Sequence, residues 1–210
     1  TSMDAEQDSL SNPYGMDEEC QNCPALCETR ENVIHGYGDV GAEFLVLGHT
    51  PSEGADEVGL PFVGDQEREL LDILETMDLV DDPDADRPQF DNVYLTYVTR
   101  CYHPEREPTD EEELNCEPYL NSEVRMINPE LLLPVGQDAL EALAFEYTMK
   151  SADELDVGAA HATTIQGRGF EILPMIEPAA ASEDELAAFR AHVTDELDRD
   201  YRQTKGQRRK

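Results

Sequence analysis

Cysteines are the residues whose type and spacing most clearly predict chemistry. Cys20 and Cys23 form a C-x2-C pair, Cys27 follows closely, and Cys101 and Cys116 flank a proline-containing loop far along the chain. In a cytosolic chain, clustering of this kind indicates metal binding rather than disulfides. Thiolates suit either zinc or an iron-sulfur cluster, and the number of cysteines does not separate the two.

Four of these cysteines suffice for a metal centre. We predict that Cys20, Cys23, Cys101 and Cys116 are the ligands and that Cys27 is a spare, buried residue. All five lie beside polar, turn-rich sequence rather than in an apolar strand, which argues against ordinary core cysteines.

The strands that must position these residues are short apolar runs. The run over 44–48 ends in a glycine and a turn-forming Thr-Pro-Ser, which indicates a buried strand that leaves into a loop. Similar runs predict strands over 93–98, 131–135 and 171–176.

Helices are predicted between the strands. Apolar residues at helical spacing predict helices over 66–77 and 138–147. A capping box at Thr109 opens another helical stretch, which Pro118 is expected to restart, and a box at Ser182 opens the last helix.

Strands that alternate with helices predict an α/β fold with a parallel sheet covered on both faces. In such sheets the ligand lies beyond the carboxyl ends of the strands. The loops after Gly48, Val98 and Ile176 should therefore surround one candidate site.

Charge is the extreme feature of the composition. The chain carries 15 Lys and Arg against 48 Asp and Glu, a net charge of −33. This balance resembles the proteome of a salt-in halophile, where the Debye length falls to ~3 Å and acidic surfaces serve solubility. Net charge therefore does not exclude a nucleic-acid ligand, but binding would depend on stacking, hydrogen bonds and shape.

The two ends differ from the body of the chain. We expect a mobile acidic tail over 1–19, one domain over 20–198 and a basic arm over 199–210, in which Arg208 and Arg209 either follow DNA phosphates or merely end the chain. No apolar run approaches the ~20 residues of a membrane span, and no basic-then-apolar leader is present. We therefore expect a cytoplasmic protein without a membrane partner.

The order of motifs resembles the iron-sulfur, family 4 uracil-DNA glycosylases. The matching pieces, in chain order, are C-x2-C-P-x-L-C-x-T-R-x-N-V from Cys20, G-x-x-P from Gly48, G-x-P-F-V-G from Gly59, a strand ending at Cys101, and C-x-P-Y-L from Cys116. The resemblance implies a three-layer α/β/α sandwich on a four-stranded parallel sheet. It also favours a 4Fe-4S cluster over zinc on the four chosen cysteines, and hydrolysis of the N-glycosidic bond of a base extruded from DNA.

The resemblance also assigns the residues of the active site, with departures. Phe62 matches the stacking phenylalanine, and Asp56 matches the acidic end of the motif that begins at Gly48. His49 replaces that motif's first acidic residue, Tyr97 replaces the asparagine that reads uracil, and Glu177 replaces the histidine of H-P-A-A. An ionised glutamate cannot donate to departing uracil, and loss of one such donor costs ~3 to 4 kcal/mol.

Three readings stay open. In an active enzyme for another lesion, His49, Asp56 and Glu177 do the polar work, Phe62 stacks and Tyr97 closes the base pocket. In the second reading the protein is a catalytically silent nucleic-acid-binding or complex-forming module. In the third it is a cluster-bearing electron-transfer or structural protein. The first two imply DNA, single-stranded or lesion-bearing, as partner, and a second protein that supplies missing residues is a further alternative.

Overall fold

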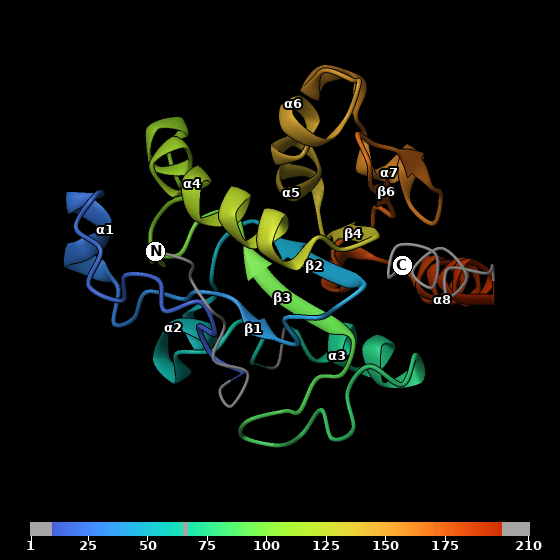
Figure 1. Cartoon of the computed structure of the whole chain (residues 1–210), viewed down its shortest axis with the longest axis horizontal. Helices are drawn as coiled ribbons and strands as arrows, with labels where there is room; N and C mark the ends of the chain where they lie inside the picture. The colour runs from blue at the N-terminus through green and yellow to red at the C-terminus, as the bar shows by residue number, and fades with distance from the viewer. Residues whose placement is uncertain (1–9, 65–66, 199–210) are drawn as a thin grey trace, which may run out of the picture.

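The computed structural model describes residues 10–64 and 67–198 and contains, within them, a six-stranded sheet of order β1-β3-β2-β4-β6-β5 (Figure 1). Strands β3, β2, β4 and β6 are parallel, and β1 and β5 add antiparallel edges. The strands are β1 (Tyr37–Gly38), β2 (Phe44–Gly48), β3 (Val93–Tyr97), β4 (Leu131–Pro134), β5 (Ile165–Gln166) and β6 (Glu171–Ile172).

Helices connect and cover these strands. The α-helices are α1 (Pro24–Thr29), α2 (Glu53–Val58), α3 (Arg68–Thr76), α4 (Asp110–Ile127), α5 (Gln137–Ala142), α6 (Ala144–Tyr147), α7 (Val157–Ala160) and α8 (Glu183–Asp198). Two 3-10 turns, η1 (Ala152–Glu154) and η2 (Pro178–Ala180), complete the connections.

The two faces of the sheet carry two separate apolar clusters, because side chains alternate along each strand. Phe44 and Val46 of β2 pack with α3 and α8, whereas Leu45 and Leu47 pack with α4 and α5. Figure 1 shows α4 and α5 on one side of the sheet and α3 on the other. The predicted α/β/α sandwich on four parallel strands is therefore confirmed, with two short antiparallel edge strands added.

Prolines shorten the strand that was predicted over 171–176. Strand β6 ends at Ile172, although Leu173 and Met175 still donate to the carbonyls of Leu132 and Pro134. Pro174 has no N–H to give to the ladder, so regular pairing stops there.

The prediction that Pro118 restarts a helix is wrong. Helix α4 runs through Pro118 without a break from its capping box at Thr109 and Glu112. A proline inside a helix costs about 3 kcal/mol, and here the buried face on both sides of it offsets that cost. The helix predicted over 138–147 is instead divided at Leu143 into α5 and α6.

Part of the segment expected to be a mobile tail is packed. Tyr14 and Met16 are buried against the α4 face of the sheet, and the Asn12 side chain exchanges two hydrogen bonds with the Met16 backbone. Residues 1–9 and the basic arm with Arg208 and Arg209 lie outside the described residues.

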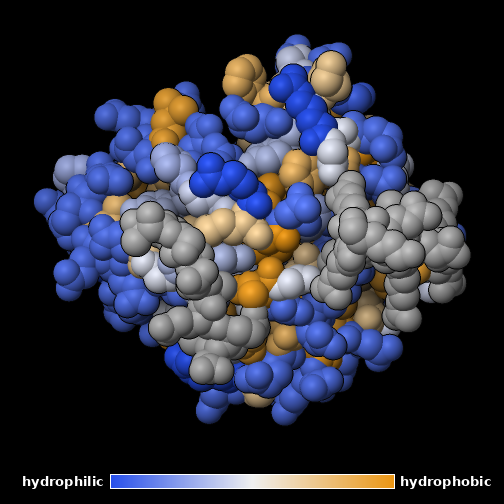
Figure 2. Space-filling model, in the orientation of Figure 1, coloured by the Kyte–Doolittle hydropathy of each residue, from blue (hydrophilic) through white to orange (hydrophobic). Residues whose placement is uncertain are grey.

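The surface agrees with the acidic composition. Figure 2 shows hydrophilic residues over most of one face, with apolar residues visible mainly near its middle. Within the described ranges, no helix combines the length and the apolar character that a bilayer crossing requires.

Candidate functional site

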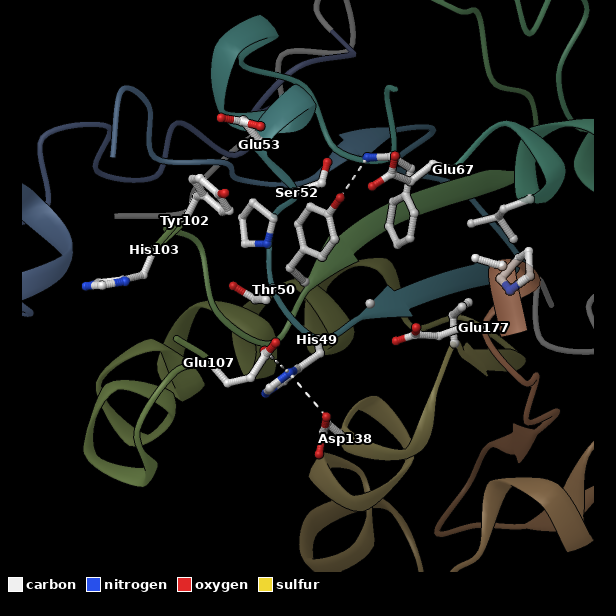
Figure 3. Close-up of a pocket in the computed structure, with 18 of the residues that line it drawn as sticks. His49, Thr50, Ser52, Glu53, Glu67, Tyr102, His103, Glu107, Asp138 and Glu177 are labelled. Atoms are coloured by element: carbon white, nitrogen blue, oxygen red, sulfur yellow. Dashed lines mark hydrogen bonds and ion pairs between the residues drawn. The ribbon is translucent and has the colours of Figure 1, made fainter. Parts of the chain in front are cut away.

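A cavity of about 410 Å³ opens at the carboxyl ends of β2, β3 and β4 (Figure 3). Its walls come from residues 48–53 after β2, residues 102–107 after β3 and residues 177–179 after β6, with Val135 and Asp138 after β4. The loops that the sequence predicted to converge therefore do so.

Phe62 and Tyr97 form a stacked aromatic pair at this cavity. Their ring centroids lie 4.7 Å apart with an interplanar angle of 18°, and the Phe62 N–H donates to the Tyr97 hydroxyl at 2.9 Å. A Cβ on Gly48 would lie 2.8 Å from both rings, so this approach requires glycine. The two residues are only 4% and 3% exposed, and Tyr97 covers one face of the phenylalanine.

His49 lies among three carboxylates. Its Nε2 is 2.6 Å from Glu113 Oε1, and its Nδ1 is 3.5 Å from a Glu107 oxygen and 3.6 Å from an Asp138 oxygen. Burial alone would lower the pKa of His49, but the hydrogen bond to Glu113 and the charges of Asp138, Glu113 and Glu107 raise it above the ordinary histidine value. The site therefore favours the imidazolium, a hydrogen-bond donor at both nitrogens.

This arrangement predicts a pH-dependent contribution of His49 to stability. We expect the free energy of unfolding of the wild-type protein to exceed that of His49→Gln most strongly below about pH 6.5, the unfolded histidine pKa. Because the folded pKa is raised, the difference should be lost as pH rises through that folded value. Urea denaturation of both proteins across this range measures it. The difference should shrink in a Glu113→Gln background, and a difference that does not change with pH would contradict the assignment.

Glu177 reaches the cavity from the side opposite to His49. Figure 3 shows its carboxylate directed toward the cavity, while the His49 ring points to Glu107 and Asp138. A Cβ on Gly136 would lie 2.8 Å from Glu177 Oε1, so glycine at that position makes room for the carboxylate. Glu177 is thus an exposed acceptor in the site, where the resemblance expects a donor.

Other acidic side chains also line the cavity. Together with Glu177 they are Glu53, Glu67, Glu107 and Asp138. Burial raises the pKa of Glu67, and a hydrogen bond from Ser52 partly opposes this. The guanidinium of Arg106, also at the cavity, makes two hydrogen bonds of 2.8 Å to Glu112 and is already neutralised.

Asp56 has a different place from the one expected of a catalytic carboxylate. It is 3% exposed and does not belong to the cavity lining. Its two oxygens accept hydrogen bonds from the backbone N–H groups of Glu31 and Asn32 at 2.8 and 3.0 Å. Asp56 therefore joins α2 to the segment after α1 and takes no place beside His49 and Glu177.

The four predicted cysteine ligands come from three segments of the chain: the segment before α1, the loop after β3, and α4. All four are buried, and Cys23 and Cys101 share one small apolar cluster with Leu26. Burial raises the pKa of Cys23, Cys101 and Cys116, and in each case the thiol of Cys20 raises it further. Cys27, expected to be buried, is partly exposed.

Two polar side chains donate hydrogen bonds to the sulfurs of these cysteines. Arg30 donates to the Cys101 sulfur at 3.0 Å, and Asn115 of α4 donates to the Cys23 sulfur at 3.6 Å. Hydrogen bonds to sulfur and an all-thiol donor set fit an iron-sulfur cluster. In the part of the chain that the structure describes, no group of three or more His, Cys, Asp or Glu side chains is arranged to hold a metal ion, so the cluster stays a prediction.

Several residues of the site were missed from the sequence. Glu67, Glu107, Glu113 and Asp138 are not marked by any motif, and in a chain with 48 acidic residues their type carries no signal. Position offers one signal: Asp138 follows a predicted strand by three residues, at the edge of the sheet where ligands bind.

Comparison with known proteins identifies the family of this chain and several relatives. The family model described as Uracil DNA glycosylase superfamily matches residues 35–198. A type-4 uracil-DNA glycosylase of Saccharolobus solfataricus is 28% identical over 189 residues, which cover 89% of this chain and 80% of that protein. Another from Archaeoglobus fulgidus is 25% identical and covers 87% and 85%. A type-5 uracil-DNA glycosylase of Pyrobaculum aerophilum is 24% identical and covers 76% and 77%.

Proposed function

Because the chain belongs to the uracil DNA glycosylase superfamily, we propose that it is a DNA glycosylase of base excision repair that carries a 4Fe-4S cluster. Its substrate is DNA with a damaged base, single-stranded or extruded from a duplex. The observation that carries this proposal is the cavity at the carboxyl ends of the parallel strands, which combines an aromatic pair with His49 among carboxylates and with Glu177 directed toward the cavity. Recognition of an extruded base needs such a combination of aromatic and polar groups.

Each of these cavity residues has a different role in the proposed reaction. Phe62 and Tyr97, which line the cavity, contact the base, and the Glu177 carboxylate orients a water molecule and accepts its proton. The ring of His49 lies among Glu113, Glu107 and Asp138 and points away from Glu177, so His49 positions these carboxylates at the cavity wall. Carboxylates also stabilise the oxocarbenium-like sugar that forms as the glycosidic bond breaks.

The cluster has a structural task in this proposal. Cys20, Cys23, Cys101 and Cys116 would hold it, with Arg30 donating to one ligand sulfur. Bound to these four residues, it would connect the segment before α1 to α4 and to the loop that leads from Cys101 into the cavity wall. Zinc on the same thiols is the second candidate, and metal analysis distinguishes them.

A single-turnover assay in molar KCl tests the function. The substrates are duplexes that carry one uracil, hypoxanthine, xanthine or alkylated or oxidised base, and alkali converts each abasic site into a strand break. We expect Phe62→Ala and Glu177→Ala each to slow base release by about tenfold or more, because one removes the aromatic contact and the other the proton acceptor. Glu75→Ala, which removes an exposed carboxylate of α3 away from the cavity, is the matched control. Indifference to both cavity variants would contradict this site.

A second function is favoured by one observation. Tyr97 lies flat on Phe62, and this contact closes the ring face on which a base would stack. The alternative is therefore a silent nucleic-acid-binding module, which would bind a fluorescent abasic duplex but release no base. Failure to bind that duplex would leave only an electron-transfer or structural role.

Further proposals concern the surroundings of the protein. We propose that Arg208 and Arg209 contact DNA phosphates without sequence preference, that the acidic surface is an adaptation to high salt in the cytoplasm, and that no membrane is involved. A protein partner that supplies missing active-site groups is the alternative to an enzyme complete in itself.

A further inference from the structure

We propose that the base accepted by the cavity is a positively charged, N-alkylated purine such as 7-methylguanine. This inference rests on the proposed glycosylase function and specifies its substrate class. It follows from the charges of the cavity, from the aromatic pair and from the chemistry of the leaving group.

Hydrogen-bond acceptors and negative charge dominate the cavity. Its described lining contains the five acidic side chains given above, whereas Arg106 is paired with Glu112 and the His49 ring lies among Glu113, Glu107 and Asp138. Contacts at hydrogen-bond distance keep most of their strength in molar salt, because screening acts mainly beyond ~3 Å. A cationic ligand with amino groups therefore matches this lining.

The leaving group gives the strongest argument. A neutral base such as uracil departs as an anion unless an acid protonates it, and the carboxylates of this cavity would repel that anion. Glu177 cannot supply the missing donor. An N-alkylated purine already carries a positive charge, so it departs as a neutral molecule and needs no anion-stabilising donor.

The aromatic pair and the cavity size fit the same ligand. Tyr97 and Phe62 lie together at the cavity and supply an apolar wall against which a purine ring can pack. The volume of about 410 Å³ lies within the range typical of small-molecule sites.

The reaction is balanced with the alkylated nucleotide and water as the only reactants. The C1′–N9 bond breaks, and its electron pair moves to N9, which neutralises the alkylated purine. The positive charge passes to the sugar, water adds at C1′, and its proton goes to the carboxylate of Glu177. The products are the neutral base, the abasic sugar and one proton.

The test compares the cluster-loaded protein on three duplexes that differ in one nucleotide: 7-methyl-2′-deoxyguanosine, 2′-deoxyuridine or 2′-deoxyinosine. After subtraction of spontaneous depurination, we expect 7-methylguanine release to be about tenfold or more faster than release of either neutral base. Glu177→Gln, which keeps the size and removes the charge, should slow it by about tenfold, and Glu75→Gln should not. Absorbance of the cluster shows that each variant is folded.

The outcomes separate the two proposals. Release of uracil or hypoxanthine at least as fast as 7-methylguanine would refute the cationic substrate and leave the glycosylase function standing. If no base is released, binding of a duplex with the 2′-fluoro analogue of 7-methyl-2′-deoxyguanosine, which resists hydrolysis, decides. Tighter binding than to unmodified DNA would support the ligand class and refute hydrolysis, whereas equal binding would refute both.

Discussion

Replacement of Glu123 by leucine is expected to lower the free energy of unfolding by about 3 to 5 kcal/mol, because the substitution leaves the Arg100 guanidinium buried without a counter-charge. Both side chains are 1% exposed, and they meet through two hydrogen bonds of 2.9 and 2.8 Å. Tyr94, Thr96 and the backbone N–H of Gly36 also donate to the Glu123 carboxylate. The Glu123 carboxylate of α4 thus accepts hydrogen bonds from donors in β3, in the loop after β3 and in the segment before β1.

A double-mutant cycle measures this coupling. Urea denaturation in molar KCl would compare Glu123→Leu, Arg100→Met and the double variant with the wild-type protein. We expect the double variant to lose less stability than Glu123→Leu alone, because no buried charge remains unpaired. A single variant as stable as the wild-type protein, or a double variant that simply adds the two single losses, would show that the pair is not coupled.

Serine at any one of Cys20, Cys23, Cys101 and Cys116 is expected to remove most of the bound metal. The loaded wild-type protein should contain about four irons per chain, the content of a 4Fe-4S cluster. Metal binding contributes directly to folding, so these variants should also unfold at lower urea concentration. Iron and sulfide analysis with visible absorbance measures the first effect, and denaturation measures the second.

Cys27→Ser is the matched control for this series. Cys27 is partly exposed and lies close to the others in sequence, with its thiol 3.6 Å from the Cys20 carbonyl oxygen. It should retain iron and stability. If Cys27→Ser lost iron and Cys116→Ser kept it, Cys27 would be a ligand in place of Cys116. If the protein bound one zinc per chain instead of iron, the site would be a zinc site and not a 4Fe-4S cluster.

Local features of the sequence predicted much of the fold. The apolar run that becomes β2 and the capping boxes at Thr109 and Ser182 lie where they were expected. These signals depend on residues within one turn or one strand, so their physical causes are present in the local sequence. The prediction at Pro118 was wrong because it used local sequence alone. Proline does destabilise a helix locally, but burial of the α4 face, which depends on the rest of the fold, outweighs that cost.

The candidate site was predicted only in part. The sequence indicated that His49, Glu177, Phe62 and Tyr97 share one place, and the cavity contains all four. The same reasoning placed Asp56 among them, whereas its carboxylate binds the backbone at Glu31 and Asn32. A motif records the order of residues, but the direction of each side chain depends on where the following helix packs.

The sequence by itself determined the four central strands and the longer helices between them, the segments that converge beyond the strand ends, and the two pairs of cysteines; the edge strands β1 and β5 and the short helices α1, α2 and α7 were not predicted. Only the tertiary structure decided which charges meet. His49 and Glu113 are 64 residues apart in the chain, and the buried carboxylate of Glu123 faces Arg100 from another element. Among 48 acidic residues, composition cannot distinguish a solvated carboxylate from one that sets the charge of a site, because that difference depends on burial and on distances between segments remote in sequence.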